Sequence, residues 1–210
     1  MTSTAAWSRQ VVTLLGHPAI KRVRRAVRDA GAWLDSLHIK NPAVAGPVQS
    51  VLFVCLGNIC RSPFADRLAR KRFHDAGIQC ASAGIVAKQS NRCPDDARAV
   101  AAEYGVSLSD HQPTLLTPEL IEGFDLIVVM EADQVRQLRR RYPQATRRIV
   151  LLSLFDPEAR GSDRFRIEDP FLRPRSEFLA CFRRIDRALQ ALAPHLVSPT
   201  GGPDSTGRSS

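Results

Sequence analysis

The sequence lacks the features of several common protein classes. Its apolar runs, such as residues 127–130 and 149–152, are strand-sized and far too short to cross a bilayer. The N-terminal residues do not show the basic-then-apolar order of a secretory signal, and the absence of acids before Asp29 resembles a transit peptide only superficially. We therefore expect no transmembrane segment.

Paired cysteines are also missing. The five cysteines, at positions 55, 60, 80, 93 and 181, are an odd number, which argues against a disulfide framework. No CxxC pair or Cys/His cluster has the spacing of zinc ligands, so we expect no metal and no other cofactor. Cysteine use of this kind is typical of a reducing compartment, which predicts a cytoplasmic protein.

The positive charge is concentrated at one end of the chain. The net charge is +9, and residues 1–48 hold seven Lys or Arg against two Asp. Residues 49–193 are only mildly basic and carry no motif that interleaves basic and base-reading residues. The body therefore favours an anionic substrate over a nucleic-acid partner.

Composition shifts divide the 210 residues into three parts. Prolines and a glycine interrupt residues 41–50, which reads as a linker. The last residues, 198–210, are rich in Ser, Gly and Pro and cannot bury apolar area. We predict a basic helical extension with its linker at 1–48, one domain at 49–193 and a disordered tail at 194–210.

Apolar strands alternate with amphipathic helices through the middle of the chain. The predicted strands are residues 51–54, 79–86, 126–130 and 148–152, and the predicted helices are 63–74, 95–104, 133–141 and 176–193. This alternation predicts an α/β fold with a doubly wound, four-stranded parallel sheet flanked by helices, plus the helical N-terminal extension. Ligands of such sheets bind beyond the carboxyl ends of the strands, where Cys55 is expected.

Apolar residues in the N-terminal extension recur at alternating intervals of three and four. They form a seam of about three heptads: Ile20, Val23, Val27, Ala30, Leu34 and Leu37. Three interpretations stay open: packing against the body of the protein at 49–193, self-association or contact with a partner, and lying on an anionic membrane surface.

The segment from residue 51 to 63 carries the pattern of a phosphate-binding nucleophile site. A free cysteine has a pKa of about 8.5, which a helix N-terminus and a nearby cation lower to roughly 3.5–7.5. A loop between a buried strand and a helix start points backbone N–H groups inward, and Arg61 can return a guanidinium fork to two phosphate oxygens. The loop between Cys55 and the helix consists of Leu56, Gly57, Asn58, Ile59, Cys60, Arg61 and Ser62.

Chance alone produces a Cys-x5-Arg spacing in so arginine-rich a chain. Cys181 and Arg187 show it too, but they lie inside an amphipathic helix with no strand before them and no glycine between them. The spacing at Cys55 and Arg61 is supported by a preceding strand, Gly57 and a following Ser-Pro pair. The functional interpretation therefore applies to Cys55.

Val-Cys-Leu-Gly-Asn-Ile-Cys-Arg-Ser-Pro resembles the phosphate loop of low-molecular-weight protein tyrosine phosphatases, and the resemblance spans about residues 50–193. It looks closest to bacterial members linked to exopolysaccharide tyrosine kinases. The resemblance implies phosphotyrosine hydrolysis through a phosphocysteine on Cys55, with Arg61 binding phosphate, Asn58 shaping the loop and Ser62 bonding the sulfur. It also implies a phosphotyrosine protein as substrate, with a cognate bacterial tyrosine kinase as one candidate. Cys60 is either a reversible disulfide partner of Cys55, as in the family, or a small buried residue.

Two Asp-Pro pairs compete for the role of general acid. Asp156 and Asp169 both lie in loops after the fourth predicted strand, and either carboxyl could protonate a leaving group. Most Asp-Pro pairs simply form turns. The resemblance favours Asp169, because the family's acid precedes the final helix.

Some positions depart from the family pattern. Phe171 and Leu172 stand where many members have tyrosines, and Ile59 stands where related arginine phosphatases carry Thr. An arsenate reductase of the same fold is an alternative, although no cysteine lies between Cys93 and Cys181 to act as its resolving thiol. A non-catalytic module that binds phosphoproteins is a further alternative, which a retained nucleophile argues against.

Overall fold

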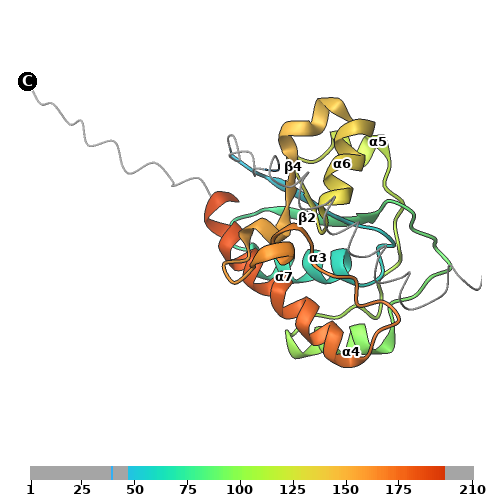
Figure 1. Cartoon of the computed structure of the whole chain (residues 1–210). Coiled ribbons are helices and arrows are strands. Elements are labelled where there is room, and N and C mark those ends of the chain that lie inside the picture. Colours follow the sequence, from blue (N-terminus) through green and yellow to red (C-terminus); the bar gives the residue numbers. More distant parts are fainter. Residues whose placement is uncertain (1–38, 40–46, 197–210) are drawn as a thin grey trace, which may run out of the picture. The chain divides into compact units, whose positions relative to one another are not determined.

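The structure is a computed structural model that describes residue 39 and residues 47–196. Its centre is a sheet of four strands: β1 (Ser50–Cys55), β2 (Gln79–Gly84), β3 (Leu126–Val129) and β4 (Ile149–Leu151). The strand order is β2-β1-β3-β4 and every pairing is parallel (Figure 1). The predicted four-stranded parallel sheet is therefore confirmed.

Helices cover both faces of this sheet. One face carries α3 (Arg61–Arg72), α4 (Asp95–Glu103) and α7 (Arg175–Leu196). The other carries α5 (Pro118–Glu122), α6 (Ala132–Arg141) and the 3-10 turn η1 (Pro143–Arg148) (Figure 1). Two further 3-10 turns, η2 (Leu152–Phe155) and η3 (Gly161–Phe165), follow β4. The doubly wound arrangement is confirmed.

The strands are continuously apolar because both of their faces are buried. Val51 and Phe53 of β1 belong to the core shared with α3, α4 and α7, whereas Leu52 and Val54 are fully buried on the opposite face. Parallel strands covered on two sides have this composition. The central strand β1 thus has no solvent-facing side, and only its carboxyl end, at Cys55, opens toward a loop.

Stacked aromatic rings fix α3 against α7. The rings of Phe64 and Phe182 lie 3.8 Å apart at an interplanar angle of 6°, and both residues are fully buried. Removing such a ring from a core costs about 3–5 kcal/mol. Since α3 begins at Arg61, this contact also fixes the start of the helix that the phosphate loop feeds.

The structure departs from the sequence prediction at two element ends and in one additional helix, besides shifts of one or two residues elsewhere. Helix α7 continues to Leu196, beyond the predicted start of the tail at 194, because Leu196 is buried one turn after Leu192. The short helix α5 was not predicted, although Thr117 caps its start by accepting a hydrogen bond from Leu120 N. Strand β2 ends at Gly84 rather than residue 86.

The predicted N-terminal helix and its apolar seam lie outside the described residues, as does most of the linker and the tail from residue 197. Self-association through that seam stays a prediction. Within the described ranges, no helix is long and apolar enough to span a membrane.

Candidate active site

The loop after β1 wraps around the sulfur of Cys55. Asn58 N donates to Cys55 Sγ at 3.3 Å, and Ser62 Oγ lies 3.0 Å from the same sulfur. Cys55 itself is only 2% exposed. The first turn of α3 begins six residues on, so the sulfur lies close to amide groups that an α-helix leaves without internal partners. This environment stabilises negative charge on the sulfur.

Asn58 holds the loop from behind and uses all its polar groups. Its Oδ1 accepts from Thr114 N at 2.8 Å, its Nδ2 donates to Ser62 Oγ at 2.9 Å, and its carbonyl oxygen lies 2.8 Å from His111 Nε2. Asn58 has a φ of 53°, which Asn tolerates better than most residues. Burial lowers the pKa of His111 despite this hydrogen bond, so at neutral pH its uncharged ring donates to the loop.

This arrangement also orients the hydroxyl of Ser62. Because Thr114 N can only donate, Asn58 Oδ1 must face it and Nδ2 must face Ser62. Ser62 Oγ therefore accepts from Asn58, and its one hydrogen is left for Cys55 Sγ at 3.0 Å or Ala83 O at 3.3 Å. The shorter contact makes Ser62 a donor to the sulfur.

The backbone of β2 approaches the loop so closely that only glycine fits at position 84. A Cβ on Gly84 would lie 2.8 Å from Asn58 N and 2.9 Å from Gly57 C, both of them backbone atoms. The next residues, Ile85 and Val86, donate their N–H groups to Cys55 O and Leu56 O at 3.0 and 2.9 Å. The two residues after β2 thus form a backing for the phosphate loop.

Arg61 is a buried junction between three segments that are distant in sequence. Its Nη1 donates to Glu131 Oε1 at 2.5 Å and to Ile167 O at 3.0 Å, and its Nη2 donates to Asp169 Oδ2 at 2.5 Å. The side chain is 1% exposed. Its Nε has no partner among the described residues. The guanidinium therefore keeps one buried donor available for an oxygen atom bound in the loop.

Electrostatics keep Arg61 charged. Burial acts to lower the pKa of its guanidinium, but the negative charges of Cys55, Asp169 and Glu131 outweigh burial and raise the pKa. A planar, permanently charged fork with aligned N–H donors suits the oxygens of a phosphate group.

The two candidate acids lie in different places. Asp169 reaches Arg61, and its other carboxylate oxygen accepts from Phe171 N at 3.2 Å, with the side chain 40% exposed. Asp156 has a fully buried carboxylate, which Arg184 and Arg187 bind at 3.0–3.1 Å. The structure brings Asp169, and not Asp156, to the phosphate loop, so the alternative that Asp156 contributes to the site has no geometric support.

Sequence reasoning missed Glu131 as a site residue. It follows β3 directly, and its Oε1 accepts from both Arg61 Nη1 and Gln134 Nε2, the latter at 3.2 Å. Gln134 is itself buried and accepts from Met130 N at 2.9 Å. The available signal was topological, because Glu131 comes after β3 as Cys55 ends β1, and parallel strands end at one edge.

We predict that Glu131 positions Arg61 rather than supplying essential charge. Replacing Glu131 by Ala should lower kcat/KM for an aryl phosphate about tenfold, because Arg61 Nη1 loses one of its two acceptors and the guanidinium can turn. Glu131→Gln keeps an acceptor oxygen and should recover most of this loss. Steady-state kinetics on both variants, with matched melting temperatures, make the test; equal losses in Ala and Gln would contradict positioning.

Three other cysteines, Cys60, Cys93 and Cys181, are buried thiols near the loop. Burial raises the pKa of Cys60, that of Cys93 to about 11 and that of Cys181 to about 12. Cys93 Sγ donates to Ile59 O at 2.8 Å. All five cysteines are free thiols, with no disulfide between them. Cys60 is 2% exposed. The reversible disulfide between Cys60 and Cys55 stays a prediction.

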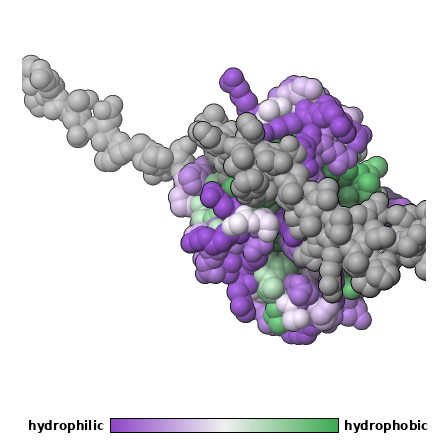
Figure 2. Space-filling model, in the orientation of Figure 1, coloured by the Kyte–Doolittle hydropathy of each residue, from purple (hydrophilic) through white to green (hydrophobic). Residues whose placement is uncertain are grey.

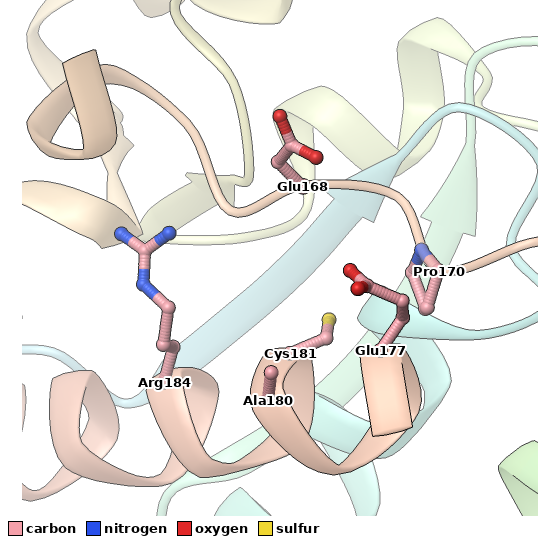
Figure 3. A pocket seen from close by; sticks show the side chains of 6 residues that line it. All are labelled: Glu168, Pro170, Glu177, Ala180, Cys181 and Arg184. Atoms are coloured by element: carbon pink, nitrogen blue, oxygen red, sulfur yellow. The ribbon is translucent and has the colours of Figure 1, made fainter. Parts of the chain in front are cut away.

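A cavity of about 140 Å³ separates the loop that carries Asp169 from α7. Glu168 and Pro170 line one side, and Glu177, Ala180, Cys181 and Arg184 of α7 line the other. In Figure 3 the Cys181 side chain points from α7 toward the segment of Glu168 and Pro170. Hydrogen bonds to Arg61 and to Met130 O, at the end of β3, hold the acid-bearing loop on the side away from this cavity's α7 wall.

No group of three or more His, Cys, Asp or Glu side chains in the described part of the chain is arranged to hold a metal ion. The assembled groups are instead a sulfur that accepts hydrogen bonds, a charged guanidinium with a free donor, and a half-exposed carboxyl beside it. Together these can bind a tetrahedral oxyanion, attack it and exchange a proton with it.

Comparison with known proteins agrees with this chemistry. The family model described as "Low molecular weight phosphotyrosine protein phosphatase" matches residues 50–199. The low molecular weight protein-tyrosine-phosphatase Etp of Escherichia coli is 33% identical over 148 residues, which cover 70% of this chain and 95% of the relative. Wzb of Salmonella typhi, of the same description, is 32% identical over 155 residues, 74% of this chain and 99% of the relative.

Solved structures agree as well. The tyrosine phosphatase AmsI of Erwinia amylovora superposes with a TM-score of 0.64 at 32% identity, covering 71% of this chain and 94% of that one. The arginine phosphatase YwlE of Geobacillus stearothermophilus gives 0.63 at 28% identity, covering 71% and 93%. With the family match, these similarities show that the chain belongs to the low molecular weight protein-tyrosine-phosphatase family and is an enzyme of that class.

Proposed function

We propose that this enzyme hydrolyses phosphotyrosine through a phosphocysteine intermediate on Cys55. One observation carries the proposal: Cys55 Sγ, Arg61 and the Asp169 carboxyl converge at the end of β1, with Ser62 and Asn58 N directed at the sulfur. A nucleophile, an anion-binding cation and a proton donor are the three groups that a two-step phosphomonoester hydrolysis uses.

In the first step the phosphate dianion binds in the loop, and its oxygens take up the free Nε and the Nη2 of Arg61. The Asp169 carboxyl is thereby released from Arg61 toward the leaving oxygen. The Cys55 thiolate forms a bond to phosphorus as the bond from phosphorus to the phenolic oxygen breaks, and Asp169 gives its proton to that oxygen. Arg61 and the loop amides stabilise charge on the equatorial oxygens.

In the second step the roles of the acid reverse. A water molecule attacks phosphorus, the Asp169 carboxylate takes its proton, and the bond from sulfur to phosphorus breaks. The products are inorganic phosphate and the Cys55 thiolate, which the hydroxyl of Ser62 stabilises as a leaving group at 3.0 Å. One carboxyl therefore serves both half-reactions.

We infer that the substrate is a phosphotyrosine protein, with a tyrosine kinase as one candidate, in a cytoplasmic setting. Ile59 supports a tyrosyl over an arginyl substrate: its buried aliphatic side chain contributes no polar group to the loop. Arsenate reduction is the weaker candidate, since burial raises the pKa of Cys93 and Cys181 and keeps both as protonated thiols.

Turnover of 4-nitrophenyl phosphate and free phosphotyrosine with EDTA present is the direct test of this function. We expect hydrolysis of both, a burst of phenol release, and an acid-quenched enzyme whose mass is raised by one phosphoryl group on Cys55. Phosphoarginine and thioredoxin-coupled arsenate serve as comparison substrates. Preferred turnover of either one, or a phosphoryl group on a different residue, would contradict the proposal.

A further inference from the structure

Leu172 combines two unfavourable features in one residue. Its φ is 59°, in the left-handed region that residues other than Gly and Asn rarely adopt. Its apolar side chain is 86% exposed, more than any other large hydrophobic residue of the described chain. Asn58 is the other described non-glycine residue with a positive φ, and it shapes the phosphate loop. Strained residues of this kind concentrate at functional sites.

The backbone around Leu172 forms a tight turn attached to the proposed acid. Arg173 N donates to Pro170 O at 2.9 Å, which leaves Phe171 and Leu172 as the two central residues. The Asp169 carboxylate accepts from Phe171 N at 3.2 Å, so the proposed acid is hydrogen-bonded to the first central residue of the turn. Leu172 occupies the position with positive φ, where Gly or Asn is usual.

Turn geometry alone does not account for a leucine at this position. Gly or Asn would form the same turn without backbone strain and without an exposed apolar side chain. Leucine at position 172 therefore costs free energy in two ways: its backbone is strained and its apolar side chain is exposed to water. Among the described residues nothing covers the Leu172 side chain, so a contact with a bound molecule would offset both costs.

Other exposed apolar residues indicate what that contact is. Five large hydrophobic side chains of the described residues are exposed. Leu56 lies in the phosphate loop, Val86 in its backing, Leu115 next to Thr114 on the β2 side, and Phe171 and Leu172 in the turn after Asp169. Val86 is bonded to Leu56 within the loop backing, and Phe171 follows the acid. Most of the described surface visible in Figure 2 is hydrophilic, with a few separate apolar patches. Apolar residues gathered around a site mark a binding surface.

The depth of the sulfur separates the roles of these residues. Cys55 is 2% exposed, so a phosphotyrosine ring must descend between the rim residues to reach it. Phe171, at 43% exposure, is more enclosed by its neighbours than Leu172. The polypeptide on either side of the phosphotyrosine then has to cross the rim, where Leu172 stands.

We propose that Leu172 is a specificity-determining residue that packs against an apolar side chain next to the phosphotyrosine of a protein substrate. This inference rests on the proposed phosphotyrosine hydrolysis and adds the substrate class: phosphotyrosine with apolar neighbours. Leu172 acts on the bound polypeptide and takes no part in the reaction at phosphorus.

The test compares wild type with Leu172→Asn and Leu172→Gly on three substrates. These are 4-nitrophenyl phosphate, a phosphotyrosine peptide with Leu on both sides of the phosphotyrosine, and its counterpart with Ser on both sides. Wild type should prefer the Leu peptide roughly five- to tenfold in kcat/KM. Both variants should lose that preference, keep 4-nitrophenyl phosphate turnover within about twofold, and melt about 2–4 °C higher because strain is removed.

Leu115 supplies a matched control. It is exposed to 52%, but its segment pairs with Gly84 on the outer side of β2, whereas the segment before the turn is bonded to Met130 at the end of β3. Three strand spacings, about 14 Å, separate the segment of Leu115 from β3. Leu115→Asn should leave the peptide preference unchanged.

Several results would overturn the inference. The first is a preference for the Leu peptide that survives in Leu172→Asn. The second is an equal loss of 4-nitrophenyl phosphate turnover, which would mean that Leu172 sets the geometry of Asp169. The third is a wild-type dimer that dissociates when Leu172 is substituted, which would mean that Leu172 contacts a second copy of the protein. Absence of any wild-type hydrolysis of 4-nitrophenyl phosphate is a separate result, because it overturns the proposed function itself.

Discussion

Replacing Cys55 by Ser is expected to lower kcat for an aryl phosphate on the order of 10⁴-fold or more. The loop holds the sulfur with one amide at 3.3 Å and one hydroxyl at 3.0 Å, and these donors stabilise an anion. A serine hydroxyl has nearly the same shape, but it stays protonated at neutral pH and is a poor nucleophile. The measurement is a progress curve at high enzyme concentration, with loss of the phosphoenzyme by mass spectrometry.

The variant should nevertheless fold and bind oxyanions, because Arg61 and the loop backbone are unchanged. Inorganic phosphate should therefore still raise its melting temperature. Cys80→Ser is the matched control, since Cys80 is also buried and its sulfur has only a distant contact, 3.9 Å from Ile78 O. Normal activity in Cys55→Ser, or an equal loss in Cys80→Ser, would remove Cys55 from the reaction.

The two Asp-Pro pairs should respond to substitution in opposite ways. Asp169→Asn is expected to lower kcat about 10²- to 10⁴-fold, because the leaving phenolate loses its proton donor. The loss should shrink for phenols that leave easily, which need less protonation. A series of aryl phosphates with leaving groups of different basicity measures this dependence. A loss that does not vary with the leaving group would contradict the role of Asp169 as acid.

Asp156→Asn should instead damage the fold. Its carboxylate is fully buried between Arg184 and Arg187, and breaking a buried pair of this kind costs about 3–5 kcal/mol. Thermal unfolding should show a melting temperature lower by roughly 10 °C, with kcat of the folded fraction retained. A collapse of kcat at unchanged stability would return the acid role to Asp156.

The pH dependence of stability gives a second measure of Asp156. Burial acts to raise the pKa of its carboxyl, but hydrogen bonds from Arg187 and Arg184 outweigh burial and hold the pKa below its ordinary value. A depressed carboxyl pKa contributes stability above about pH 4, and that stability is lost as the pH falls through the folded-state value. The melting temperature of Asp156→Asn should therefore fall less steeply than that of wild type as the pH is lowered below about 4.

Much of the site was predictable because it is local in sequence. Cys55, Asn58, Arg61 and Ser62 fall within eight consecutive residues, and the apolar strand before them and the helix after them have clear patterns. The ring of groups around the sulfur follows from that segment alone. The sheet was predictable for a related reason, since strands buried on both faces are continuously apolar.

The remaining features depend on contacts between distant segments. Glu131 meets Arg61 across 70 residues, and no local pattern marks Glu131 as a site residue. The two Asp-Pro pairs have similar local sequences, so only the fold separates Asp156 under α7 from Asp169 at the loop. The positive φ of Leu172 was unpredictable because leucine disfavours that backbone conformation. Helix α5 was missed because its five residues are too few to show a helical periodicity.

The burial of Arg61 has a consequence for how variants of this enzyme are interpreted. Its guanidinium ties the helix start to the ends of two chain segments, through Glu131 and through Ile167 and Asp169. Substituting Arg61 thus removes both an anion receptor and a cross-brace of the folded domain, and the resulting inactivity would mix lost chemistry with loosened architecture. A change at Cys55 leaves that brace in place and reports on the reaction alone, whereas a change at Asp169 also alters one contact of the brace.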